Sequence, residues 1–189
     1  IKKLKTGYKT TKLTLTPVKK SPDERLGALF RAAQINNIHG DGKTFVDLVP
    51  NHELRKIVKA YEKEALEPGF NLQVFIAQHF REYKTSTEEA ATLDTSDPEK
   101  YINGLWEKLT RRTDAVAGSL FPLPHSYIVP GGRFQEQFYW DSYFVMLGLE
   151  AQGRHDITDG IMANFVHMMR KFGFIPTGNR TYFLTRSQP

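Results

Sequence analysis

Apolar residues recur at intervals of three and four in five separate stretches of the chain, which is the spacing of one face of an α-helix. The apolar positions of these stretches are Leu26, Leu29, Phe30 and Ala33; Leu54, Ile57, Val58, Tyr61 and Ala65; Leu72, Phe75, Ile76 and Phe80; Ile102, Leu105, Trp106 and Leu109; and Ile157, Ile161, Phe165, Met168 and Met169. We expect each set to line the buried face of one helix.

Capping residues mark where the predicted helices begin and end. Asn51 is expected to cap the second helix, and Asp97 followed by Pro98 is expected to open the fourth. Asn and Asp side chains accept hydrogen bonds from free N–H groups, and proline fits the first helical turn. Another helix is expected from about residue 138 to 152. Gly173 is expected to end the last helix, because glycine adopts the left-handed conformation of a helix C-terminus without strain.

Polar or Pro/Gly-rich segments separate the helices. They contain no alternating run of strand length, apart from short sequences such as Thr181–Leu184. A short helix near residues 72–83 and long loops at 122–138 and 173–189 complete the pattern. The sequence therefore predicts an all-α protein of five to seven helices without an internal repeat. The two long loops each adjoin a helix, a place where functional residues are common.

The formal net charge of +5 arises from one end of the 189-residue chain. Residues 1–20 contain seven Lys and no acidic residue, and the rest of the chain holds 19 basic and 21 acidic residues. We therefore expect a flexible basic tail at 1–20 and a folded part at 21–189. Because the tail has no interleaved Arg or stacking array, we expect no nucleic-acid partner. The alternative, a tail that binds nucleic acid or an anionic membrane, predicts binding with a steep salt dependence.

The composition excludes several kinds of chemistry. The chain has no cysteine, and so no disulfide or thiolate nucleophile. The six His are scattered without metal-ligand spacing, so we expect no metal site. No glycine-rich nucleotide motif is present. No apolar run approaches the roughly 18–20 residues that cross a bilayer, and no signal-peptide region begins the chain. Because the first residue is not Met, we expect residues upstream of it.

One stretch, PGGRFQEQFYWDSYF at 130–144, combines glycines, charged residues and many aromatic rings. The Arg133 guanidinium presents a fork of N–H donors that can bind adjacent hydroxyls; the alternative is a structural ion pair with Glu136 or Asp141. The Trp140 ring can stack on the C–H face of a sugar, and the alternative places it in the core. Glu136 and Asp141, five positions apart, lie on different faces of a helix and are a poor catalytic pair.

The second loop, GNRTYFLTRSQP, offers hydrogen-bonding side chains without negative charge. They are those of Asn179, Arg180, Arg186, Ser187 and Gln188. Such a set suits a neutral polyol, and the alternative is a solvated loop.

Both loops resemble motifs of the α,α-trehalases, glycoside hydrolase family 37. PGGRFQEQFYWDSY is similar to the family signature P-G-G-R-F-x-E-x-Y-x-W-D-x-Y, and IPTGNRTYFLTRSQP resembles the block P-N-G-N-R-x-Y-x-x-x-R-S-Q-P. SPDERLGALFRAAQ, DGKTFVDLVPN and INGLWEKLTR also resemble the N-terminal segment of bacterial trehalases. The resemblance covers residues 21–189.

The resemblance implies an (α/α)6 toroid, incomplete in this chain, and hydrolysis of trehalose to two glucose molecules with inversion, without metal or cofactor. The positions that contact the sugar in this family match Arg133, Trp140, Asp141, Arg186, Ser187 and Gln188. The Tyr of the family signature falls at Phe138, which lacks the phenolic hydroxyl. The family's Asn falls at Thr177, whose hydroxyl can still donate and accept.

In this family the general acid Asp and the general base Glu lie downstream of the R-S-Q-P block, so we assign no catalytic residue in this chain. We expect the chain to be truncated at its C-terminus, inactive alone, and to expose apolar helix faces that the missing C-terminal segment covers. The complete enzyme is expected to be a periplasmic monomer, with a cytoplasmic location as the alternative. The competing hypothesis is a truncated homologue that binds a disaccharide without cleaving it.

Overall fold

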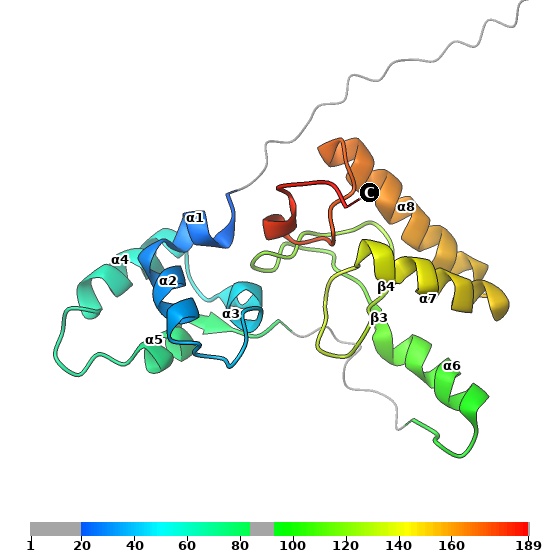
Figure 1. The fold of residues 1–189 in the computed structure, drawn as a ribbon, viewed down its shortest axis with the longest axis horizontal. Coiled ribbons are helices and arrows are strands. Elements are labelled where there is room, and N and C mark those ends of the chain that lie inside the picture. The colour runs from blue at the N-terminus through cyan, green and yellow to red at the C-terminus, as the bar shows by residue number, and fades with distance from the viewer. Residues whose placement is uncertain (1–19, 84–92, 189) are drawn as a thin grey trace, which may run out of the picture.

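The computed structural model describes residues 20–83 and 93–188, and these residues are mostly helical, which confirms the predicted class (Figure 1). The tail predicted at 1–20 lies, apart from Lys20, outside the described residues. None of the helices within these ranges combines the length and the apolar character needed to cross a bilayer. The described residues form eight α-helices, more than the five to seven predicted, because the first predicted helix is divided and a four-residue helix, α3, was not predicted. They are α1 (Pro22–Leu26), α2 (Ala28–Ile35), α3 (Thr44–Asp47), α4 (Leu54–Glu64), α5 (Leu72–His79), α6 (Pro98–Leu109), α7 (Tyr139–Ala151) and α8 (His155–Phe172).

Glycines and a capping carboxylate set several of these boundaries. Gly27 has a φ of 51°, which side chains rarely adopt, and it divides the first predicted helix into α1 and α2. Gly173, with a φ of 81°, ends α8 as predicted. Asp97 caps α6 as predicted, because its carboxylate accepts hydrogen bonds from two backbone N–H groups of the first turn.

Two short antiparallel strand pairs interrupt the helices, and the sequence pattern did not predict them. β1 (Val49–Pro50) pairs with β2 (Phe80–Arg81), and β3 (Thr110–Arg111) pairs with β4 (Tyr127–Ile128). Each strand has two residues, too few to show an alternating pattern. The strand-like sequence at 181–184 instead begins with a 3₁₀ helix, η2 (Thr181–Phe183).

The β1–β2 pair accounts for two wrong predictions near it. The helix expected near residues 72–83 ends at His79, because β2 follows at once. Asn51, expected to cap the second helix, donates instead from its side-chain nitrogen to the Gln78 carbonyl at 3.1 Å beside the strand pair. Helix α4 begins at Leu54 without a side-chain cap.

The hydrophobic residues form two main cores. One lies among α1–α5 around Leu29, Ile57 and Phe75, and the other lies around Leu149 of α7 and Ile161 of α8. Figure 1 shows α1–α5 on one side of the molecule and α6–α8 on the other, with long irregular segments between them. These segments include the two loops that the sequence marked as functional.

Helices α7 and α8 each expose several large apolar side chains in this structure. The predicted burial of Met169 in α8 and Ile102 in α6 was wrong, because their side chains are 42% and 41% exposed. Contiguous apolar patches usually mark surfaces that contact another part of a protein. The other exposed apolar residues of the α7–α8 pair are Trp140, Tyr143, Phe144, Leu147, Met162 and Val166.

Candidate functional site

The two candidate loops lie side by side at the start of α7. The Tyr139 N–H donates to the Thr177 carbonyl at 2.9 Å, and Phe138 and Gly178 form an antiparallel bridge. The Asn179 carboxamide oxygen accepts from the Gln137 N–H at 2.7 Å. These bonds hold the turn that leads into Trp140 and Asp141 against the segment that carries Thr177.

A buried ionic network lies directly beneath the paired loops. The Glu136 carboxylate accepts from Arg180 through Nε at 3.2 Å and Nη2 at 3.1 Å, and both side chains are almost fully buried. Lys43 Nζ lies 2.6 Å from the other Glu136 oxygen. Asp47, at the end of α3, pairs with Lys43, lies 3.4 Å from Arg180 and accepts from the Tyr182 hydroxyl at 2.8 Å.

This network keeps Glu136 ionised. Burial alone would raise the pKa of the Glu136 carboxyl, but Arg180 and then Lys43 beside it lower the pKa more, so it lies below its ordinary value. Burial and the neighbouring Asp47 raise the pKa of Tyr182, which stays a neutral hydrogen-bond donor. A buried carboxylate between two cations is a structural element and a poor proton donor at neutral pH.

Asn179 and Arg180, two of the five polar residues that the sequence offered for a polyol, belong to the interior. Asn179 is fully buried and donates to the Phe121 carbonyl at 2.8 Å while its oxygen accepts from Gln137. Arg180 bonds to Glu136, and its Nη1 also donates to the Ser119 hydroxyl. The prediction that they contact a ligand directly was therefore wrong. Their hydrogen bonds to buried groups hold the second loop in place.

Arg133 pairs with neither of the acids that the sequence alternative named. Its Nη2 lies 3.1 Å from Asp41 Oδ2, 92 residues away in the chain. The Arg133 side chain is 56% exposed, so much of it faces solvent. The ion pair with Glu136 is excluded because Arg180 and Lys43 occupy that carboxylate.

Trp140 and Asp141 occupy the first turn of α7. Trp140 is 61% exposed, so it lies outside the core that the described residues form. Its ring meets the Phe144 ring edge to face, with 5.6 Å between centroids. Asp141 is half-buried, and a carboxylate is favourable at this position near the positive end of the helix dipole.

The remaining predicted contacts lie along the second loop. Thr177 is half-buried, and Arg186, Ser187 and Gln188 are exposed. The Gln188 N–H donates to the Ile175 carbonyl at 2.9 Å, so the end of the second loop lies beside its beginning. The three exposed side chains are therefore available to a ligand.

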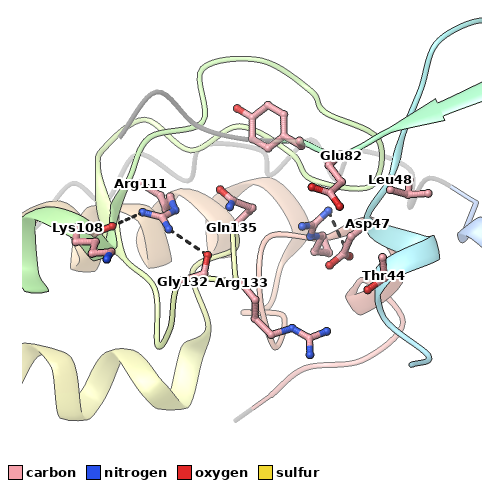
Figure 2. A pocket seen from close by; sticks show the side chains of 11 residues that line it. Thr44, Asp47, Leu48, Glu82, Lys108, Arg111, Gly132, Arg133 and Gln135 are labelled. Carbon is pink, nitrogen blue, oxygen red and sulfur yellow. Dashed lines mark hydrogen bonds and ion pairs between the residues drawn. The ribbon is translucent and has the colours of Figure 1, made fainter. Parts of the chain in front are cut away.

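Two cavities flank the network. The first has a volume of about 610 Å³, and Arg133 and Arg180 are the candidate residues among those that line it. Figure 2 shows Arg111 in its wall, directed at the carbonyl oxygens of Lys108 and Gly132, at 2.7 and 3.4 Å. Within the described residues, no cluster of three or more His, Asp or Glu side chains is arranged to hold a metal ion.

The second cavity has a volume of about 410 Å³, and five of the ten residues that line it are aromatic. Phe138 lies here, with its ring centroid 5.4 Å from that of Phe134 and 6.0 Å from that of Phe183. Phe138, the position of the signature's Tyr, thus lies in an apolar setting.

Comparisons with known proteins identify the family. The sequence model described as Trehalase matches residues 37–189. The periplasmic trehalase of Pseudomonas aeruginosa is 42% identical over 177 residues, which cover 89% of this chain and 31% of the relative. The periplasmic trehalases of Shigella flexneri and Escherichia coli K12 are 43% identical over 177 residues, or 92% of this chain. The chain spans 31% of the length of these relatives, and it belongs to the trehalase family.

Proposed function

We propose that this chain forms part of the sugar pocket of an enzyme that hydrolyses α,α-trehalose to two glucose molecules with inversion. The observation that carries the proposal is the pairing of the two loops, in which the Tyr139 N–H bonds to the Thr177 carbonyl. This pairing sets residues from both trehalase-like motifs beside each other in a chain of the trehalase family.

Each proposed contact has a chemistry that suits a neutral disaccharide. The exposed Trp140 ring offers a flat apolar face for the C–H face of a glucose ring. Arg133 and Asp141 supply a donor fork and an acceptor for ring hydroxyls. Four side chains of the second loop complete the set: those of Thr177, Arg186, Ser187 and Gln188.

The acid and the base of the reaction are expected outside residues 21–189. Inversion requires two carboxyl groups separated by about 6.5–9.5 Å, so that a water molecule fits between the base and the sugar. Glu136 is unsuited to either task, because it is buried and bonded to Arg180 and Lys43. We propose that a further part of the polypeptide supplies both groups and closes an (α/α)6 toroid over the exposed faces of α7 and α8.

The periplasm is the proposed compartment, because the three relatives above are named periplasmic trehalases. Residues 21–189 are proposed to form the N-terminal part of the catalytic domain, preceded by the basic tail.

Glucose release from trehalose tests the proposal, measured on the full-length gene product and on the 189-residue chain in parallel. We expect release by the full-length product and none by the chain alone. A full-length product that binds trehalose but releases no glucose would instead establish a non-catalytic disaccharide-binding homologue.

A further inference from the structure

We infer that Asp41 is a positioning residue of the sugar site, whose carboxylate holds the guanidinium of Arg133 in one orientation for the substrate. This inference rests on the proposed function, since that proposal makes Arg133 a sugar contact. Asp41 belongs to the DGKTFVD segment, and no sugar contact was assigned there from the sequence.

The Asp41 carboxylate is itself held firmly. Its Oδ1 accepts from the backbone N–H of Lys43 at 2.8 Å and of Thr44 at 2.6 Å, and its Oδ2 accepts from the Thr44 hydroxyl at 2.9 Å. The backbone N–H of Thr44 is the largest of several influences that lower the pKa of Asp41 to about 2. The carboxylate is therefore a fixed anion at neutral pH, anchored on the turn that opens α3.

Asp41 leaves much of the Arg133 guanidinium free. Their contact joins one terminal nitrogen of Arg133, Nη2, to Oδ2 of Asp41 at 3.1 Å. The Arg133 side chain is 56% exposed, and its guanidinium lies 5.7 Å from the centroid of the Phe134 ring. An arginine held on one side by a carboxylate and below by a ring presents its other N–H groups in a defined direction.

The turn that carries Asp41 is locked to both candidate loops. Lys43, two residues on, contacts Glu136 at 2.6 Å, and Glu136 lies three residues after Arg133. Asp47, at the other end of α3, contacts Arg180 and Tyr182 of the second loop. The distance from Asp41 to Arg133 is thus set by contacts of Lys43 and Asp47 with the buried side chains of Glu136 and Arg180.

Stability alone does not account for the pair. Both side chains are at least one third exposed, and exposed ion pairs contribute little to the free energy of folding. We therefore expect the Asp41–Arg133 pair to act on the orientation of the Arg133 guanidinium, and this orientation to affect the affinity for the sugar.

The test compares Asp41→Asn with Asp114→Asn in the full-length gene product. Asn at position 41 keeps an oxygen for the two backbone N–H groups but loses the charge that faces Arg133. Asp114 forms an exposed pair with Arg112 at 2.8 Å and serves as the matched control. The first readout is the rate at which phenylglyoxal modifies Arg133, followed by peptide mass. The second is the dissociation constant for trehalose.

We expect Asp41→Asn to raise the modification rate of Arg133 several-fold and to weaken trehalose binding about tenfold, as loss of a positioning contact does. Asp114→Asn should change neither quantity. An unchanged rate at Arg133, or unchanged trehalose affinity, in Asp41→Asn would overturn the inference. If trehalose neither binds the unmodified protein nor protects its Arg133 from phenylglyoxal, the proposed function fails, and the sugar role of Asp41 fails with it.

Discussion

Glu136 and Arg180 form a buried ion pair in which one carboxylate oxygen accepts from both Nε and Nη2 of the guanidinium, at 3.2 and 3.1 Å. Each residue lies at the centre of one trehalase-like motif, 44 positions apart. The pair therefore joins the two motifs through their interiors, while the residues proposed to contact sugar flank it on the surface.

Glu136→Gln is predicted to destabilise the protein strongly. It removes the charge that balances Arg180 and Lys43, and breaking a buried pair on one side costs about 3–5 kcal/mol. The free energy of unfolding in urea measures the effect. Glu53→Gln, at the exposed pair with Lys56 (3.8 Å), serves as the control and should change it by less than about 0.5 kcal/mol. Equal effects of the two substitutions would show that the buried pair does not hold the loops.

Stability is predicted to fall in acid because of two carboxyls. The folded-state pKa of Glu136 lies below its ordinary value of 4.5, and that of Asp41 falls from 3.8 to about 2. Groups with depressed folded pKa values stabilise the protein above their unfolded pKa, and this contribution is lost as pH falls through the folded value. The free energy of unfolding should therefore decline below about pH 4.5, towards pH 2. It should decline less steeply in Glu136→Gln; identical slopes would contradict this assignment.

Trp140→Ala is predicted to weaken trehalose binding without unfolding the protein. Because Trp140 is 61% exposed in the 189-residue chain, its removal should cost that chain less than about 1 kcal/mol of folding free energy. Loss of a stacking ring should reduce trehalose affinity by about tenfold or more, measured by calorimetry on the full-length gene product. Val116→Ala, 57% exposed and outside both motifs, is the control. A similar loss in both variants would argue against a specific role for Trp140.

Thr177→Asn is predicted to strengthen trehalose binding. The substitution restores the amide of the family motif, and the Thr177 carbonyl that bonds to Tyr139 is part of the backbone and stays in place. One added hydrogen bond should raise the affinity by about threefold to tenfold. Weaker or unchanged binding would indicate that this position does not face the sugar.

Local patterns were sufficient for much of the fold. The three- and four-residue spacing of apolar residues in α8 and the Asp97 cap of α6 predicted these helices correctly, because both features act within a few residues of the chain. The division of the first helix depends on the backbone conformation of Gly27. The end of α5 at His79 depends on the strand pair that follows, in which Phe80 pairs with Pro50, 30 residues earlier. Periodicity carries no information about either.

The site was harder to predict than the helices. Motif similarity indicated Arg133 and Trp140, and the exposure of both in the structure is compatible with ligand contact. The partners of Arg133 and Glu136 were not evident, because Asp41 and Lys43 lie more than 90 positions earlier in the chain. The charges of Asp41, Lys43 and Asp47 in DGKTFVD were the available signal, and a solvent-exposed turn carries charges of the same kind.

The stereochemistry of trehalose hydrolysis distinguishes an inverting trehalase from the alternatives. Proton NMR during the first minutes of the reaction, before the anomers equilibrate, distinguishes α-glucose from β-glucose released by the full-length gene product. An inverting trehalase releases one molecule of each anomer per trehalose, so we expect equal initial amounts of α-glucose and β-glucose. Release of α-glucose alone, or no release of glucose, would contradict the proposed inverting hydrolysis.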